Sequence, residues 1–155
     1  MKMKSCCITS ALLLLVVMAL LYKFLWQGEV APASDDRSAI LMPAQERDLV
    51  LREMRGFLQA VQAILIAAER ENSQGIADAA RQVGAVQQQG MPGTLVKRLP
   101  AGFKKLGRDT HRRFDQMALD AEQLGDTRHS LQQLGALMTN CVSCHASYRI
   151  DLIDE

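Results

Sequence analysis

The sequence lacks several features that would direct it to a common class of protein. Lys and Arg number 18 against 17 Asp and Glu in 155 residues, so its charge does not predict a nucleic-acid or polyanion binder. Cysteine is scarce: Cys6 and Cys7 are adjacent near the N-terminus, and Cys141 and Cys144 lie near the C-terminus. That arrangement is not a disulfide framework. With no period-two run, hairpin turn or internal repeat evident, nothing predicts a sheet or a repeat protein.

The first 26 residues form a long apolar run, "ITSALLLLVVMALLYKFLW", after a short basic start. About twenty apolar residues span a bilayer as a helix. Tyr22 and Trp26 suit the interfacial aromatic belt, Lys23 can snorkel to the headgroups, and Lys2 and Lys4 favour a cytoplasmic N-terminus. The run therefore predicts a membrane anchor that leaves the rest of the chain on the periplasmic side of a bacterial inner membrane.

A cleaved signal peptide is the alternative interpretation of the same segment. The letters "APA" at 31–33 fit a small-residue cleavage site, which would release a soluble periplasmic protein after Ala33. The apolar run is longer than an ordinary signal core, which favours the anchor. Cys6 and Cys7 precede this run, whereas a lipoprotein cysteine follows one, so we interpret both as incidental.

The remaining chain is predicted to be all-α. Residues 27–43 contain prolines, a glycine and an acidic pair without sustained periodicity, and are predicted to be a linker. Residues 44–155 suffice for one domain. Apolar residues recur every three or four positions over 44–72, 75–88, 100–124 and 126–150, separated by "NSQG", "GMPG" and "GDT". The prediction is an antiparallel four-helix bundle preceded by a transmembrane or signal helix.

Two of the apolar stripes carry the functional argument. The stripe of the first bundle helix is predicted to face inward and consists of Leu51, Met54, Leu58, Val61, Leu65 and Ala68. The corresponding stripe of the last helix consists of Leu131, Leu134, Met138, Cys141, His145 and Tyr148.

The motif "CVSCH" at 141–145 is the most specific feature of the sequence. On a helix, Cys141, Cys144 and His145 fall at i, i+3 and i+4 and leave the same face within one turn. C-x-x-C-H is the attachment signature of haem c, in which two thiols form thioethers and the adjoining histidine ligates the iron. The motif therefore predicts one covalently bound haem, with His145 as the proximal ligand.

Other interpretations of the motif fit less well. A thioredoxin-like C-x-x-C opens a helix that follows a strand, whereas this motif lies deep in the last predicted helix. A structural zinc site needs a second ligand pair, and only His111 and His129 are available, without paired spacing. Cysteines that only pack in the core are the remaining alternative.

The segment "NCVSCHASYR", on the last helix of a four-helix domain, resembles the cytochrome c prime family, the class II c-type cytochromes. The resemblance covers roughly 45–150. It implies thioethers at Cys141 and Cys144, iron ligation by His145 and a basic residue, Arg149, one turn further along. High-spin members cover the distal face with a bulky apolar residue and bind nitric oxide or carbon monoxide, whereas low-spin relatives supply a methionine and transfer electrons. The resemblance also allows a homodimer.

The choice between these two kinds depends on the first bundle helix. Met54 lies on its predicted inward stripe, and a methionine thioether opposite a histidine favours electron transfer. Met54 is therefore predicted as the sixth ligand, although methionine is also an ordinary core residue. Leu58, one turn on, is the predicted cap of a five-coordinate, gas-binding iron. Met138 lies on the haem helix itself, and Met91 and Met117 are weaker candidates.

A basic run could steer an acidic redox partner or contact anionic lipid, but is more simply a solvated face. It comprises Lys97, Arg98, Lys104, Lys105, Arg108, Arg112 and Arg113. His111, within it, is predicted to be a solvated or partly buried helix residue, and Arg52 or Arg55 is predicted near a haem propionate. We expect an electron carrier and no enzymatic reaction.

Overall fold

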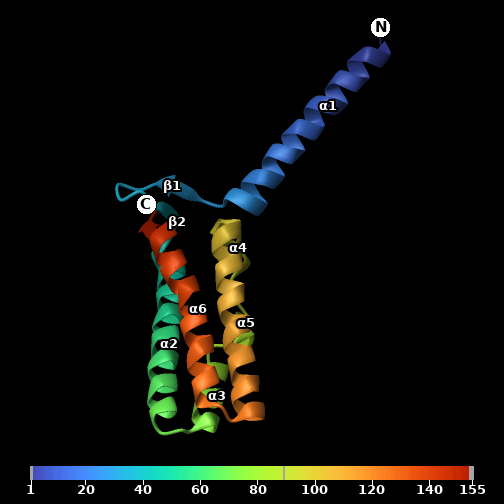
Figure 1. Cartoon of the computed structure of the whole chain (residues 1–155). Coiled ribbons are helices and arrows are strands. Elements are labelled where there is room, and N and C mark those ends of the chain that lie inside the picture. The colour runs from blue at the N-terminus through green and yellow to red at the C-terminus, as the bar shows by residue number, and fades with distance from the viewer. Residues whose placement is uncertain (1, 89, 154–155) are drawn as a thin grey trace.

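The computed structural model describes residues 2–88 and 90–153, without the side chains of 2–7, 24–25 and 87–88. The chain is mainly helical, as predicted (Figure 1). Its helices are α1 (Lys2–Leu21), a π-helical turn η1 (Tyr22–Gln27), α2 (Ala44–Glu69), α3 (Ser73–Arg81), a 3₁₀ turn η2 (Ala85–Gln88), α4 (Gly93–Arg98), α5 (Ala101–Leu124) and α6 (Thr127–Ser147). Its strands are β1 (Val30–Pro32), β2 (Ser38–Met42) and β3 (Tyr148–Leu152).

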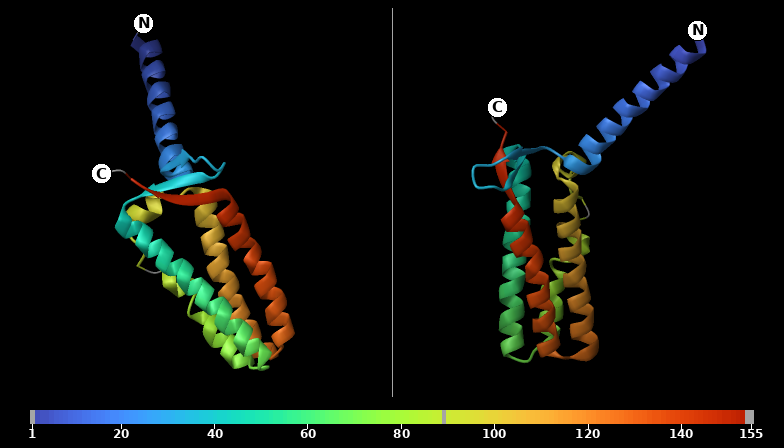
Figure 2. Two further views of the ribbon diagram at one scale, coloured as in Figure 1. Left: turned by 90° about the vertical axis from the view of Figure 1, so that its left-hand side faces the viewer. Right: turned by 45° about the horizontal axis from the view of Figure 1, so that its top comes forward.

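Helices α2, α3, α5 and α6 pack side by side, and each runs opposite to the one before it (Figures 1 and 2). Helix α5 begins after Pro100 and ends at Gly125, whose φ of 64° is the left-handed conformation of a helix C-cap. The Asp126 side chain then accepts from the backbone N–H of His129 and caps α6. These two boundaries agree with those predicted from "GDT".

The three strands correct the prediction that the chain has no sheet and that 27–43 is an irregular linker. Strand β2 pairs antiparallel with β1 and parallel with β3, and the small sheet lies across one end of the bundle (Figure 2). Ile40 and Met42 of β2 are fully buried against Leu95 and Leu99. The segment "SAILM" is apolar almost throughout, so it gives no alternating pattern, yet its burial makes it part of the domain.

Two helix ends also differ from the prediction. The last helix stops at Ser147, three residues early, and Tyr148, Ile150 and Leu152 alternate with Arg149 and Asp151 in β3. Tyr148 is therefore not part of a helical stripe. An alternation of apolar and charged residues is the signature of a strand, and it was present in the sequence.

The second predicted helix, 75–88, is shorter in the structure: α3 ends at Arg81, and the chain passes Gly84 before the 3₁₀ turn η2. Asp115 of α5 lies so close that a Cβ at Gly84 would fall 1.8 Å from its Oδ1, and its Oδ2 accepts from Ala85 N at 2.9 Å. Val86, which lies in η2, is exposed. Helix α4 was not predicted at all.

The α2 stripe that contacts the core is offset from the predicted one. The buried residues of α2 are Val50, Phe57, Ala60, Ile64, Ala67 and Ala68. Phe57 stacks on Phe114 at 5.6 Å between ring centroids. Leu58 and Leu65, predicted to face inward, are 70% and 50% exposed. Helix α2 thus has two adjacent apolar arcs, and only one of them faces the core.

Helix α1 projects away from the bundle, while the η1 turn contacts α4 and α5 (Figure 1). Wherever side chains are described, no helix combines the length and the apolar character needed to cross a membrane. The side chains of Cys6 and Cys7 lie outside the described residues. The anchor over 1–26 stays a prediction.

Candidate functional site

A cavity of about 630 Å³ lies among α2, α5 and α6, close to the sheet. Its size is within the range of about 300–1,000 Å³ that is usual for sites that hold a small molecule or cofactor. The lining is mainly apolar and comprises Leu51, Glu53, Met54, Arg55, Phe57, Leu58, Val61, Met91, Val96, Leu99, Phe103, Lys104, Leu106, Gly107, Arg108, Thr110, His111, Met138, Asn140, Cys141, Cys144 and His145.

All three residues of the C-x-x-C-H motif line this cavity. Cys141, Cys144 and His145 come from the last two turns of α6, and their helical spacing places them on one side. Both cysteines are free thiols and are partly buried, whereas His145 is exposed. Two thiols and an imidazole therefore line the same cavity.

The environment of the thiols does not favour a dithiol redox centre. Burial raises the pKa of Cys141, and burial followed by the proximity of Cys141 raises the pKa of Cys144 to about 11. Reactive C-x-x-C thiols instead have a lowered pKa at a helix N-terminus, whereas these lie near the C-terminus of α6. Among the described residues, no group of three or more His, Cys, Asp or Glu side chains could hold a metal ion by itself.

The predicted distal residues line the same cavity. Met54 is partly buried and packs against both core clusters, and Leu58 lies one turn further along α2. The offset of the core-facing stripe explains their position, because the second apolar arc of α2 faces this space. Of the alternative methionines, Met138 and Met91 also line the cavity, whereas Met117 is fully buried in the core.

The aromatic residues near the motif and Arg149 differ in whether they line the cavity. Phe103 lines the cavity, but Phe114 belongs to the core cluster. Tyr148 packs edge-on against Phe103 at 5.7 Å between ring centroids and is not part of the lining. Arg149, in β3, pairs with Asp151 and also does not line the cavity.

The structure adds a pair of side chains, the buried His111 and the partly buried Glu53, that the sequence did not reveal. His111 is 1% exposed, which corrects the prediction of a solvated or partly buried residue. Its Nδ1 lies 2.8 Å from the Val83 carbonyl, and its Nε2 lies 2.9 Å from Glu53 Oε1. Because a carbonyl only accepts, Nδ1 carries a proton, and a second proton lies between Nε2 and the carboxylate.

Hydrogen bonding decides the titration of His111. Burial lowers its pKa, but the hydrogen bonds to Glu53 and to the Val83 carbonyl outweigh burial, so the pKa lies above its ordinary value. Both His111 and Glu53 line the cavity. A single histidine in a basic stretch gave no sequence signal for this pairing, since its partner is on another helix.

Three cationic side chains are among the residues that line the cavity. Arg55, Lys104 and Arg108 line the cavity, whereas Arg52 does not. The rest of the basic run is partly neutralised: Arg98 pairs with Glu29 and Glu46, and Arg112 and Arg113 pair with Asp109. Hydrogen bonds from Asn140 and Arg113 hold the pKa of Asp109 well below its usual range.

His129 lies at the start of α6, far along the helix from the motif, and contacts Asp120.

Comparison with known proteins finds no match among protein-family models, curated proteins or solved structures.

Proposed function

We propose that this chain is a mono-haem c-type cytochrome of the cytochrome c prime kind, which carries single electrons outside the cytoplasm. The observation that supports the proposal best is the cavity itself. It is lined by the two thiols and the imidazole of the C-x-x-C-H motif from α6, and by the Met54 thioether from α2.

The residues present are chemically suited to haem c. Cys141 and Cys144 are free thiols for two thioether bonds, and His145 is the imidazole ligand that this motif supplies. Apolar side chains such as Leu58 and Phe103 provide low-dielectric walls, and Arg55, Lys104 or Arg108 would neutralise propionates. Haem, when bound, supplies the one-electron iron couple. The protein contributes ligation, the exclusion of water and a docking surface for a redox partner protein.

A gas-binding haem protein is the second candidate, and one observation favours it. Met54 packs against both core clusters, which is enough to explain a methionine at this position without ligation. Leu58, which also lines the cavity, would then cover a five-coordinate iron.

A redox titration distinguishes these candidates. For an electron carrier we expect one reversible one-electron transition, with a reduced protein that is low-spin and binds carbon monoxide only by displacing a ligand. The measurement is an optical spectrum recorded over a range of applied potentials, with and without carbon monoxide. A high-spin reduced protein that binds the gas at once would support the second candidate, and a protein without any visible absorption would contradict both.

We further propose that the N-terminal segment is retained as a membrane anchor. Residues just before the "APA" site are built into the domain: Glu29 N donates to Arg98 O at 2.8 Å, and Leu41 N donates to Glu29 O at 2.9 Å. Gly28 is buried, and a Cβ there would meet Arg98 O at 2.3 Å. Cleavage after Ala33 would remove β1 and these contacts, and would leave β2 with an unpaired edge.

The retained anchor predicts a membrane-bound protein. The full chain should stay with the membrane fraction through a high-salt wash and be released by detergent, because apolar burial is insensitive to salt. The measurement is fractionation followed by N-terminal sequencing. Recovery of a soluble protein that begins at Ser34 would contradict retention and establish cleavage after Ala33.

A further inference from the structure

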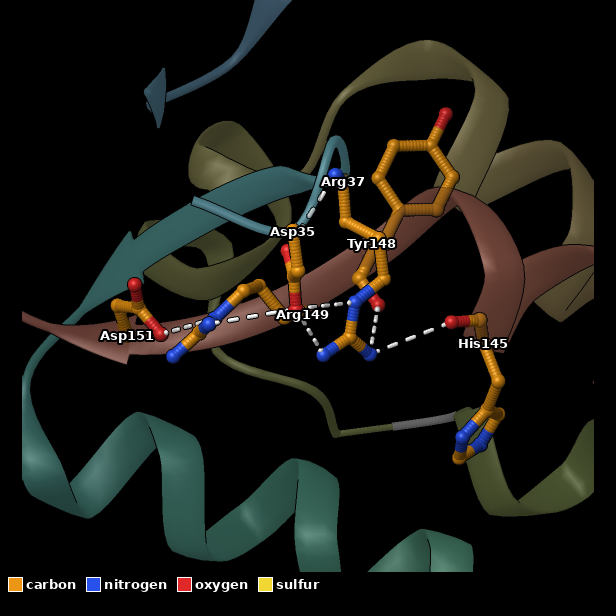
Figure 3. Close-up of polar contacts among 6 residues, drawn as sticks. All are labelled: Asp35, Arg37, His145, Tyr148, Arg149 and Asp151. Carbon is orange, nitrogen blue, oxygen red and sulfur yellow. Dashed lines mark hydrogen bonds and ion pairs between the residues drawn. The ribbon is translucent and has the colours of Figure 1, made fainter. Parts of the chain in front are cut away.

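The turn between β1 and β2 lies against the C-terminal end of α6, although the two are more than a hundred residues apart in sequence (Figure 3). From this turn, Arg37 Nη1 lies 3.3 Å from the carbonyl oxygen of His145 and 3.5 Å from that of Tyr148. The contact is thus made to the backbone of the histidine that ends the C-x-x-C-H motif.

The contact supplies a hydrogen-bond donor to a backbone carbonyl at the C-terminal end of α6. The last carbonyls of a helix have no partner within the helix and carry its negative dipole end. The N–H of Tyr148 donates to the Cys144 carbonyl, and the guanidinium of Arg37 donates to the next one, that of His145. A fixed cation at this position stabilises the last turn and restricts the backbone of His145.

The guanidinium is itself held in place. Asp35 Oδ2 accepts from Arg37 Nε at 2.9 Å and from Nη2 at 2.6 Å (Figure 3). Arg149 Nη1 lies 3.4 Å from the same oxygen, and Arg149 Nε donates to Asp151 at 2.8 Å. Four alternating charges therefore connect the turn to β3, and the ordered pair presents Arg37 in one orientation.

The backbone brings Arg37 to this position. Asp36 adopts φ 62°, a left-handed conformation that Asp tolerates in turns, and Ala33 N donates to Arg37 O at 3.0 Å to close the turn. Ser38 then pairs with Tyr148 in the parallel register of β2 and β3. Arg37 thus precedes the first paired residue of β2, next to the end of α6.

We propose that Arg37 is a positioning residue for His145, through which the segment that follows the N-terminal helix controls the proximal side of the haem. This inference rests on the proposed function, because it assigns Arg37 a role toward the ligand that His145 would provide. Loss of Arg37 frees the His145 backbone and removes a positive charge near the iron. The loss of charge disfavours the reduced iron and so lowers the midpoint potential. The freed backbone leaves the orientation of the imidazole ligand less restricted.

The test uses the full-length protein with bound haem and the variants Arg37→Ala and Arg37→Lys. Arg37→Ala should lower the midpoint potential and, in a Met54→Ala background, shift or broaden the iron–histidine stretching band of the reduced protein. Arg37→Lys retains the charge and one donor at a time, so it should recover part of the potential. Arg81→Ala is the matched control, since it removes an exposed arginine paired with Glu122 at a distance from the site. It should leave both readouts at the parent values.

A potential and a stretching band in Arg37→Ala that equal those of the parent would overturn the inference. Amide hydrogen exchange at Tyr148 provides a readout that needs no haem, and it should be faster in Arg37→Ala than in Arg81→Ala. A parent protein without covalent haem would refute the proposed function, and equal exchange in these two variants would refute the contact. If Arg37→Ala fails to fold, Asp35→Asn releases the guanidinium without removing its charge. It should accelerate amide exchange at Tyr148 relative to Arg81→Ala, and unchanged exchange there would refute the proposal.

Discussion

Replacing Cys141 and Cys144 together by alanine should abolish covalent attachment of haem. The two thiols line the same cavity from one face of α6, and among the described residues they are the free cysteines. Each thioether bond needs one of these two sulfurs, and no other side chain of the lining can form one. We therefore expect a complete loss of haem from the denatured polypeptide, measured by haem staining on a denaturing gel.

A matched control is available within the same chain. Cys6 and Cys7 are also paired in sequence but precede the apolar run, so replacing both by alanine should leave attachment unchanged. A single Cys141→Ala or Cys144→Ala variant should retain haem through one thioether, with a shifted spectrum. Covalent haem that persists in the Cys141→Ala, Cys144→Ala double variant would refute the assignment of these two thiols.

Replacing Met54 by alanine should convert the site from low-spin to high-spin. Met54 lines the cavity from α2, and a thioether ligand stabilises ferrous iron because sulfur is a soft donor. Its removal should open a coordination position, accelerate carbon monoxide binding and lower the midpoint potential. The fall should be on the order of 0.1 V, well within the roughly 0.8 V range that axial ligands cover.

Two further variants separate ligation from packing. Met138→Ala removes a methionine that lines the same cavity from α6, and Leu58→Ala removes the other predicted distal residue. Both should remain low-spin if Met54 is the ligand. If the parent protein is high-spin and its spectrum does not respond to Met54→Ala, the electron-transfer assignment is wrong and the gas-binding candidate is favoured.

The sequence allowed some of these elements to be predicted and not others, for physical reasons. Pro100, Gly125 and Asp126 impose local backbone conformations, so the limits of α5 and the start of α6 could be predicted from them. The strand at 38–42 could not, because "SAILM" pairs with residues more than a hundred positions away and has no alternation of its own. Local patterns do not encode such long-range pairing.

In the candidate site, too, some residues could be predicted from local spacing, and others depend on how distant segments pack. Cys141, Cys144 and His145 are adjacent in one helix, so their convergence follows from helical spacing alone. That Met54 lines the same cavity depends on how α2 packs, and only a broad apolar arc indicated it. The pairing of His111 with Glu53 and the contact of Arg37 with α6 join distant segments through single side chains. No periodicity predicts contacts of that kind.

The central claim is that this chain carries one haem attached through its C-x-x-C-H motif. The most direct measurement is the intact mass of the full-length protein, produced in cells that attach haem, after denaturation in acid and organic solvent. We expect the mass of the polypeptide plus one haem, carried by the proteolytic peptide that contains Cys141, Cys144 and His145. An unmodified polypeptide, or haem that is extracted by the solvent, would contradict the claim.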